Sequence, residues 1–344
     1  MIRHKVNRNL PRRAEACCHT APKMDNKRMD KLGRREFITT AMGTAGLLGA
    51  AFLVKNDSSS APATEASTLI VDCSIKSPVD KVPLGRSGIK ASVVGIGTGT
   101  IGWNHQSNQT RLGQQAFNRL IGYALDRGIT FFDLADQYGS NPYFSKAVEG
   151  VARDHYVIQT KTNSRDPNMV RQDIDRFLRE LKTDYIDSLI IHCVTESDWT
   201  SRYRGVMDAL EQARQKGKIR AHGVTCHSFA ALQAAEASDW VQVNQVRWNP
   251  LGAHMDAEVD ASRKLFGKMR SKGQGMIGMK VVGQGDIVNG SRAISPEDCF
   301  RFQIESGVVD AFVVGVEKIK HIDQMIRGTQ IALNEFGYKA VQRA

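Results

Sequence analysis

The chain has 344 residues, and 41% of them are hydrophobic, which is enough to bury a full core and excludes disorder throughout. Its formal net charge of +11 is concentrated at the start, because residues 1–63 hold 12 Lys and Arg against 5 Asp and Glu (+7), leaving 35 against 31 (+4) for the rest. No basic run with interleaved aromatic residues indicates a nucleic-acid partner. The six cysteines show no spacing that suits zinc, so no metal site is expected.

Residues 1–63 are expected to form a leader. Arg34 and Arg35 precede a weakly apolar stretch from Thr39 to Val54, and the small-residue tail 58–63 follows it. This order resembles a twin-arginine export signal, which implies the twin-arginine export machinery as a partner and a periplasmic destination. The apolar stretch is short for a membrane span of about 20 residues, so no stable span is expected in the mature form. Met1 and Met29 are both candidate translation starts, and cleavage of the signal is left open.

The remaining chain is divided into a linker (64–81), a barrel domain (82–337) and a C-terminal tail (338–344). Residues Val82–Ser92, with Arg86-Ser87-Gly88 at their middle, predict a short β-hairpin that closes the barrel floor. After it, β-branched apolar runs alternate with amphipathic stretches, which is typical of repeated βα units around a parallel sheet. The expected strands are Ser92–Gly97, Thr130–Leu134, Tyr156–Thr160, Ile186–His192, Ala221–Thr225, Trp240–Val246, Gly275–Lys280 and Ala311–Val314.

Eight strands are the number that closes a (β/α)8 TIM barrel, and this is the fold class that we expect. Helical patterns lie between the strands at Thr110–Asp126, Met169–Leu181, Gly205–Lys216 and Ala257–Ser271. Gly128, Gly217 and Gly273 stand just past three helices, where left-handed caps are expected. A doubly wound dinucleotide-binding sheet is the alternative, but residues 95–99 supply only part of its glycine pattern and no helix begins there.

Polar residues stand at the ends of successive expected strands, where barrel enzymes place their active sites. Asp133 ends the second strand, Tyr138 follows on its loop, Lys161 ends the third strand and His192 ends the fourth. Taken singly, these residues are as well explained by a turn, a loop aromatic, a solvated strand end and a core histidine. Their recurrence at four strand ends favours a shared site.

Four segments resemble the motifs of the aldo-keto reductase family in order and spacing. They are Gly128–Gly139 (GITFFDLADQYG), Gln159–Lys161 (QTK), Asp184–His192 (DYIDSLIIH) and Gly217–Val224 (GKIRAHGV). The resemblance extends from Val82 to about Phe336. It implies a nicotinamide-dependent oxidoreductase that reduces an aldehyde or ketone to an alcohol, with Asp133, Tyr138, Lys161 and His192 as its catalytic residues.

The implied chemistry gives each residue a role. A nicotinamide delivers hydride to a carbonyl carbon, and Tyr138 donates the proton that the carbonyl oxygen takes up. A free phenol has a pKa of about 10, and the ammonium of Lys161 would lower it by favouring the phenolate. Asp133 would compensate the buried charge of Lys161, and His192 would donate a hydrogen bond to the carbonyl oxygen.

The resemblance also implies a set of cofactor-binding residues, namely Gly97, Thr98, Thr225, Gln245, Met279, Lys280, Gly315, Lys318, Lys320 and Gln324. Cys226 stands where Asn is common in the family, and Met279 stands where many members stack a Tyr on the nicotinamide. Lys318 and Lys320 could bind the 2′-phosphate of NADP, whereas Glu317 would repel it. NADP is therefore favoured, and NAD remains an alternative.

The pocket is expected to be open, because the chain ends soon after its last helix. Trp103, Trp199 and Trp248 either line this pocket or pack beneath the loops at the strand ends. Two other functions use the same features. One is oxidation of a sugar or alcohol in the reverse direction, and the other is a cofactor-binding regulatory protein with little turnover. A barrel without any ligand does not explain the polar set, and neither the substrate nor the oligomeric state has a signature in the sequence.

Overall fold

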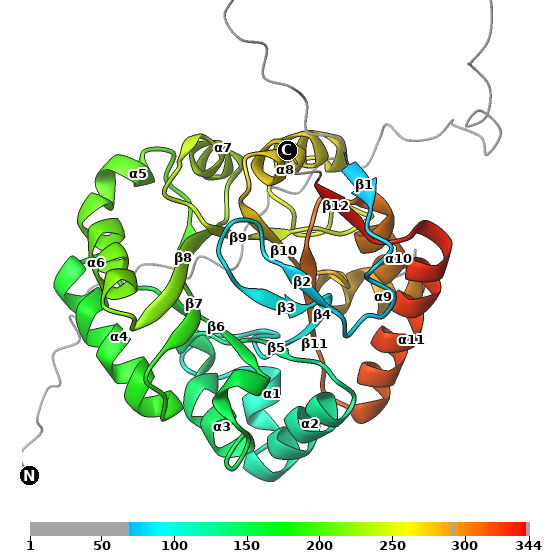
Figure 1. The fold of residues 1–344 in the computed structure, drawn as a ribbon, viewed down its shortest axis with the longest axis horizontal. Coiled ribbons are helices and arrows are strands. Elements are labelled where there is room, and N and C mark those ends of the chain that lie inside the picture. Colours follow the sequence, from blue (N-terminus) through cyan, green and yellow to red (C-terminus); the bar gives the residue numbers. More distant parts are fainter. Residues whose placement is uncertain (1–68, 290–292, 342–344) are drawn as a thin grey trace, which may run out of the picture. The chain divides into compact units, whose positions relative to one another are not determined.

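In the computed structural model, residues 69–289 and 293–341 are described. The expected leader and its export signal therefore lie outside the described residues. Eight parallel strands close into a barrel in the order β10-β11-β4-β5-β6-β7-β8-β9, and β9 pairs with β10 to complete the ring. The predicted (β/α)8 barrel is confirmed, and helices surround it (Figure 1).

The barrel strands begin or end within a few residues of their predicted bounds. They are β4 (Val94–Gly97), β5 (Phe131–Asp133), β6 (Val157–Thr162), β7 (Ile186–Val194), β8 (Ile219–Cys226), β9 (Val243–Arg247), β10 (Gly275–Met279) and β11 (Ala311–Gly315). The largest shift is at β9, which begins at Val243 rather than at Trp240. The Trp240 ring instead stacks on the imidazole of His222, with centroids 4.2 Å apart.

The helices of the outer layer follow the strands in alternation. They are α1 (Asn108–Arg111), α2 (Gln114–Asp126), α3 (Ser140–Ala147), α4 (Pro167–Leu181), α5 (Trp199–Arg202), α6 (Arg204–Gln215), α7 (Phe229–Ala237), α8 (Val259–Ser271), α9 (Asp286–Asn289), α10 (Pro296–Ser306) and α11 (Ile319–Phe336). The single helix predicted over Thr110–Asp126 is wrong, because Gly113 with φ 80° separates α1 from α2. Gly128, Gly217 and Gly273 all have φ in the left-handed region, as predicted for helix caps.

The predicted hairpin is present and covers one end of the barrel. Strands β2 (Lys81–Pro83) and β3 (Lys90–Ser92) pair antiparallel, and they cross the barrel end in Figure 1. Leu84 and Ile89, in the turn that joins them, are buried. The backbone N–H of Arg86 donates to the carbonyl of Gly273 at 2.8 Å. This hairpin packs against the N-terminal ends of the barrel strands and forms their floor.

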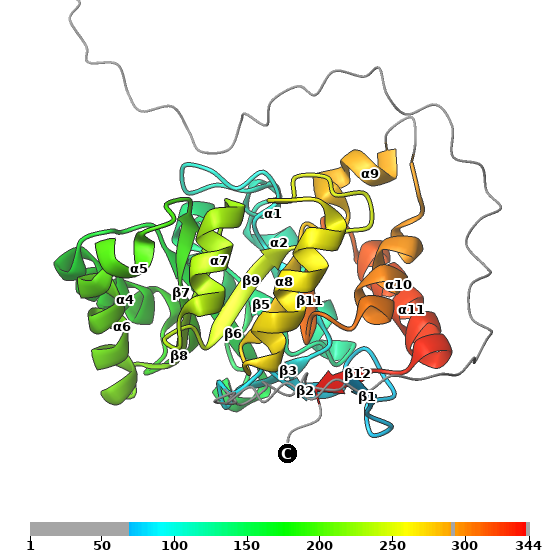
Figure 2. The ribbon, with the colours of Figure 1, turned by 90° about the horizontal axis from the view of Figure 1, so that it is seen from above.

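A second small sheet joins the two segments that were expected to be linker and tail. β1 (Leu69–Val71) pairs antiparallel with β12 (Lys339–Val341), so part of the predicted linker and part of the predicted tail are ordered. All three residues of β1 are exposed, and without an alternating buried face the sequence gives no strand pattern. The sheet lies at the same end of the barrel as β2 and β3 (Figure 2).

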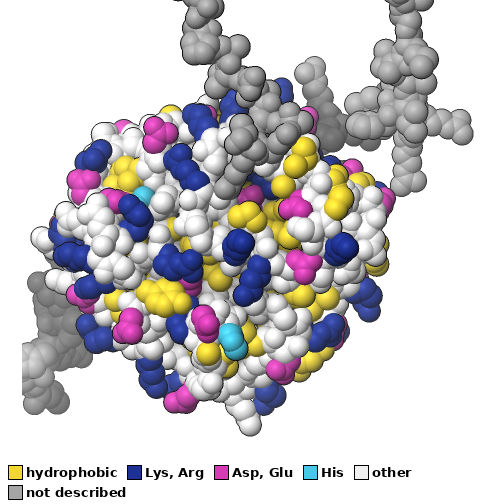
Figure 3. Space-filling model, in the orientation of Figure 1, with side chains coloured by type: hydrophobic (Ala, Val, Ile, Leu, Met, Phe, Trp, Pro, Cys, Tyr) yellow, Lys and Arg dark blue, Asp and Glu magenta, His cyan; other side chains and the backbone are white. Residues whose placement is uncertain are grey.

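The surface at the hairpin end has a mixed character. Lys and Arg side chains lie among acidic and hydrophobic ones over the face seen in Figure 3. Within residues 69–289 and 293–341, no helix combines the length and the apolar character that a membrane crossing requires.

Candidate active site

The four predicted catalytic residues lie together at the end of the barrel opposite the hairpin. Asp133 is the last residue of β5, Lys161 lies in β6 and His192 lies in β7. Because these strands are parallel neighbours, their C-terminal ends meet at one rim. Tyr138 ends a short 3-10 helix, Asp136–Tyr138, that follows β5. In Figure 2 this rim faces away from β2 and β3.

Lys161 and Asp133 form a buried ion pair. The Lys161 Nζ donates to Asp133 Oδ1 at 2.6 Å and to the carbonyl of Leu134 at 2.8 Å, and the lysine side chain has no exposed surface. Gln159 Nε2 also donates to Asp133 Oδ1, at 2.8 Å. Burial lowers the pKa of Lys161, and the attraction of Asp133 for the ammonium only partly opposes this shift. Asp133 therefore favours the charged form of Lys161, but the pKa of this lysine stays below that of an exposed lysine.

Tyr138 lies between this pair and His192. Its hydroxyl is 3.3 Å from His192 Nε2, and its ring centroid is 4.9 Å from Lys161 Nζ. His192 is buried, and burial, reinforced by the positive charge of Lys161, holds its pKa well below the usual range. The imidazole is therefore neutral near pH 7, and the phenol has a cation on one side and a neutral ring on the other.

Two glycines that the sequence did not single out make room for Tyr138. A Cβ at Gly99 would lie 2.3 Å from ring carbon Cε2 of Tyr138, and one at Gly102 would lie 2.3 Å from Cδ1. In real structures, a Cβ essentially never lies closer than 3.0 Å to an atom outside its own residue and the neighbouring residues. The loop after β4 therefore forms a slot for the phenol ring, and the glycine-rich run 95–102 was the signal that could have indicated it.

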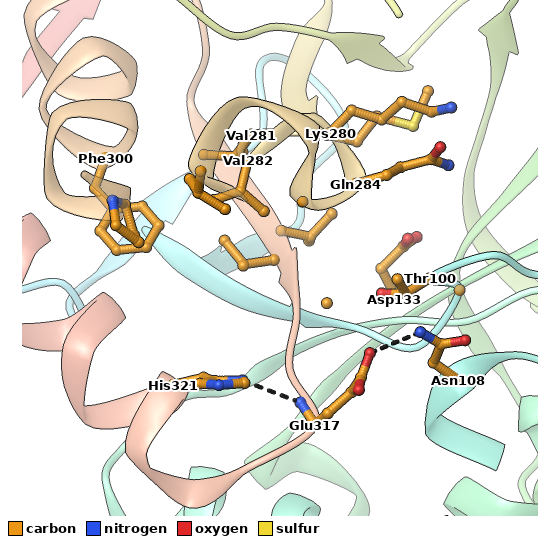
Figure 4. A pocket seen from close by; sticks show the side chains of 18 of the residues that line it. Thr100, Asn108, Asp133, Lys280, Val281, Val282, Gln284, Phe300, Glu317 and His321 are labelled. Carbon is orange, nitrogen blue, oxygen red and sulfur yellow. Dashed lines mark hydrogen bonds between the residues drawn. The ribbon is translucent and has the colours of Figure 1, made fainter. Parts of the chain in front are cut away.

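A cavity of about 510 Å³ opens beside the pair (Figure 4). Six of the predicted site residues line it, namely Asp133, Tyr138, Met279, Lys280, Gly315 and Gln324. Val281, Val282 and Phe300 form part of its apolar wall. At its polar end, Asn108 Nδ2 donates to Glu317 Oε1 at 2.8 Å, and the backbone N–H of Glu317 donates to His321 Nδ1 at 3.4 Å. The cavity thus runs from Asp133 and Tyr138 to the start of α11.

Six other predicted cofactor residues are not part of the cavity lining, namely Gly97, Thr98, Thr225, Gln245, Lys318 and Lys320. Thr98 uses both its N–H and its hydroxyl to bind the carbonyl of Asp133, at 3.0 and 2.9 Å. A Cβ at Gly97 would lie 3.3 Å from the backbone nitrogen of Gly315, so this position joins β4 closely to β11. Lys318 and Lys320 are exposed at the start of α11.

Gln245 and Thr225 fit the carboxamide of a nicotinamide. Both amide atoms of Gln245 and the hydroxyl of Thr225 are buried and have no hydrogen-bond partner within the described residues. A buried polar group without a partner is costly, and a carboxamide offers both a donor and an acceptor. Cys226 is buried with a pKa raised well above the usual thiol range by burial, so it is a neutral thiol and supplies no amide where the family commonly has Asn.

Of the three tryptophans that were considered for the pocket, two belong to the core. Trp199 and Trp248 are fully buried, and their Nε1 atoms donate to the carbonyl of Ala231 and to Ser306 Oγ, each at 3.1 Å. The expectation that they line an open pocket is therefore wrong, and packing beneath the strand-end loops is right. Trp103 is about half exposed, on the loop after β4.

The described residues contain no group of three or more His, Cys, Asp or Glu side chains that could hold a metal ion. The four cysteines that the structure describes, Cys73, Cys193, Cys226 and Cys299, form no disulfide. The ion pair, the phenol, the imidazole and the adjoining cavity make up the candidate site.

Comparison with known proteins agrees with this geometry. The family model "Aldo/keto reductase family" matches residues 93–297. The chain is 26% identical to probable aldo-keto reductase 1 of Glycine max over 268 residues, covering 73% of this chain and 72% of that protein. It is 29% identical to L-galactose dehydrogenase of Arabidopsis thaliana over 153 residues, covering 41% and 47%.

Solved structures show the same fold. An aldo-keto reductase from Klebsiella pneumoniae in complex with NADPH superposes with a TM-score of 0.57 at 17% identity, covering 77% of this chain and 97% of that one. Another, AKR11C1 from Bacillus halodurans in its holo form, gives a TM-score of 0.59 at 16% identity, covering 77% and 98%. With the matched family model, the closed barrel and the buried Asp133–Lys161 pair beside Tyr138, the chain belongs to the aldo/keto reductase family of nicotinamide-dependent oxidoreductases.

Proposed function

We propose that the chain reduces an aldehyde or ketone to an alcohol with NAD(P)H, and that Tyr138 donates a proton to the carbonyl oxygen. The observation that carries this proposal is the placement of the Tyr138 ring 4.9 Å from the Nζ of the buried Lys161, at the mouth of a cavity. A bound nicotinamide supplies hydride at the carbonyl carbon. Oxidation of an alcohol uses the same residues in reverse, with Tyr138 as the base.

The surrounding residues favour loss of the Tyr138 proton. As the proton leaves, negative charge develops on the phenol oxygen, and the ammonium of Lys161 stabilises it. Asp133 holds that ammonium at 2.6 Å, and Gln159 fixes the carboxylate in turn. Because Lys161 has no exposed surface, water does not screen its charge from the phenol.

The cavity would hold the dinucleotide, with its polar end toward the adenosine. Gln245 and Thr225 do not line the cavity, and their buried, unpartnered polar atoms are the groups that would bind the carboxamide. NADPH is favoured over NADH because Lys318 and Lys320 flank the start of α11, where a 2′-phosphate would find two cations and a helix N-terminus. Glu317 lies within the cavity and weakens this preference. Fluorescence titration with NADPH and NADH measures the difference directly.

Replacement of Tyr138 by Phe tests the proposed reaction. The substitution removes the hydroxyl but keeps the ring in its slot, so we expect NAD(P)H binding to persist while turnover on a panel of carbonyl compounds falls by about 10²–10⁴-fold. Unchanged turnover would exclude Tyr138 as the acid. If the wild-type chain binds NADPH but turns over no carbonyl or alcohol, the regulatory function is favoured instead.

We also propose that the protein is exported through the twin-arginine route. The support is the order of Arg34, Arg35, the apolar stretch and the small-residue tail in the leader. This route carries folded proteins, so a tightly retained cofactor would be acquired before export. Fractionation of cells that express the wild type and the double variant Arg34→Lys, Arg35→Lys tests this. Equal periplasmic amounts of the two would refute it, and purified mature protein without bound nucleotide would refute the retention.

A further inference from the structure

A cluster of four charged side chains joins the segment that carries Tyr138 to α4. Arg176 of α4 donates through Nη1 to Asp136 Oδ1 at 2.7 Å. It also donates to Glu180 Oε1 at 2.9 Å and, through Nη2, to Asp173 Oδ1 at 2.8 Å. Asp136 begins the 3-10 helix that ends at Tyr138. The guanidinium therefore brings one carboxylate of the rim together with two carboxylates of its own helix.

Asp173 links this cluster to β6. Its Oδ2 accepts the hydroxyl of Thr162 and the hydroxyl of Ser164, each at 2.6 Å. Thr162 is the last residue of β6 and directly follows Lys161. Because side chains alternate along a strand, Thr162 points toward the helices while Lys161 points toward Asp133. The cluster is thus attached to the backbone beside the catalytic lysine.

Glu180 makes a second link to the same strand. Its Oε2 accepts the amide Nδ2 of Asn141 at 3.2 Å, and Asn141 Oδ1 accepts the hydroxyl of Thr160 at 3.0 Å. Thr160 directly precedes Lys161 in β6. Asn141 belongs to α3, which begins two residues after Tyr138 and is a neighbour of α4 in the outer layer (Figure 1). Both sides of the lysine are therefore connected to α4.

The loop after β4 closes the other side of the Tyr138 segment. His105 Nδ1 lies 3.0 Å from the carbonyl oxygen of Asp136. Gly139 has φ 62°, and a Cβ there would collide with the carbonyl of His105. Tyr138 stands between these two contacts. The segment is therefore held by the loop after β4 on one side and by Arg176 on the other.

The cluster depends on its guanidinium, because three carboxylates converge on it. In the described part of the chain, Asp173 and Glu180 form ion pairs with no cation other than Arg176. Asp136 has one further partner, the imidazole of His105, at 3.6 Å. Without the guanidinium, the three negative charges repel one another. Asp136 is the one that moves, since it stands on the rim and the other two are fixed in α4.

We propose that Arg176 is a positioning residue, whose bond to Asp136 fixes the Tyr138 ring beside Lys161. Arg176 is not part of the cavity lining, so it acts on the reaction only through the residues that it holds. The proposal rests on the proposed role of Tyr138 as the acid. The position of the ring, however, can be measured without turnover.

The ring is followed by NMR of protein that carries ¹³C-labelled tyrosine, with the Tyr138 resonance assigned by its absence in Tyr138→Phe. In Arg176→Met we expect this resonance to move and kcat to fall by about tenfold, while the affinity for NADPH is unchanged. Arg176→Lys keeps the charge and should recover part of both. Arg171→Met is the control, because Arg171 is an exposed residue of the same helix that contacts Asn168 and Gln212. It should change neither the resonance nor kcat.

A second background separates positioning from a general loss of structure. If Arg176 acts through the phenol, Arg176→Met should cause no further loss of kcat in Tyr138→Phe. Asp136→Asn weakens the same contact but leaves the bonds of Arg176 within α4, so it should move the resonance even if Arg176→Met folds poorly. An unmoved resonance in both variants, or the same loss of kcat in the Tyr138→Phe background, would overturn the proposal. A moved resonance in a chain whose wild type reduces no carbonyl would support the positioning and count against the proposed reaction.

Discussion

The barrel holds a buried ion pair at each end, and the two pairs differ in how completely they are satisfied. At the floor, Arg270 of α8 donates through Nε to Asp310 Oδ1 at 2.9 Å and through its other nitrogens to the carbonyls of Gly307 and Lys339. The second oxygen of Asp310 accepts the backbone N–H of Met276 at 2.8 Å. The guanidinium of Arg270 and both carboxylate oxygens of Asp310 therefore make hydrogen bonds, and these bonds link α8 to β10, to β12 and to the segment before β11.

At the rim, the corresponding pair is Lys161 and Asp133, and its carboxylate lines the cavity. Burial lowers the pKa of Lys161 more than Asp133 raises it. Burial also opposes the charge of Arg270, but Asp310 and Tyr338, through their charges and hydrogen bonds, together exceed this effect and raise the arginine pKa. A buried ion pair thus holds the floor together through Arg270 and Asp310. At the rim, the pair of Lys161 and Asp133 instead provides a cation with a lowered pKa.

Replacing Arg270 by Met should cause the largest loss of stability. It leaves Asp310 buried without its cation, which costs about 3–5 kcal/mol when one partner of a buried pair is removed. Urea unfolding followed by circular dichroism measures this, and kcat of the folded protein should be unchanged. As a control, Arg301→Met removes an exposed partner of Glu335 and should cost less than about 1 kcal/mol. Equal losses in the two variants would contradict the distinction between them.

Replacing Lys161 by Met should act on the reaction as well as on stability, because it also leaves Asp133 buried without its cation. Loss of the ammonium removes the charge that stabilises the phenolate of Tyr138, so we expect kcat to fall by about 10²–10³-fold, or about 2.7–4 kcal/mol. NADPH binding, followed by fluorescence, should persist. Only the charged form of Lys161 is effective, so wild-type kcat should decline as the pH rises through its lowered pKa. Lys182→Met, at an exposed lysine, is the control, and a matching loss of kcat there would refute this role.

Much of the fold and the central site could be predicted from local patterns. Apolar runs that end in Asp133, Lys161 and His192 indicate both the strands and the polar rim, because parallel strands bring their ends together. The pairing of β1 with β12 could not be predicted, since its partners stand at opposite ends of the described chain and neither shows an alternating pattern. The break at Gly113 was missed because the apolar periodicity of 110–126 continues across it.

Contacts between the rim loops could not be predicted from local sequence patterns either. Gly99 and Gly102 are more than thirty residues before Tyr138, and only the folded barrel places their backbone against its ring. Asn163 immediately follows a strand and has the composition of an ordinary loop residue, so its bond to His192 depends on the closure of β6 against β7. The residues proposed to carry the chemistry were thus easier to identify than the residues that contact them.

Replacing Gly99 by Ala should have the smallest of these effects. The added Cβ would lie 2.3 Å from the Tyr138 ring, so the phenol must move, and a displacement of this kind should lower kcat by about 10–100-fold. Gly122→Ala adds the same methyl group to α2, where no atom lies within 4 Å of the new Cβ, and should stabilise the helix by about 0.5–1 kcal/mol with kcat unchanged. Steady-state kinetics and urea unfolding of both variants separate the two effects. If Gly99→Ala kept full kcat, the reaction would not depend on the position of Tyr138 in its slot. A loss of kcat with retained stability would show that the glycines of the rim loop position the Tyr138 ring, whereas the ion pair at the floor contributes to stability.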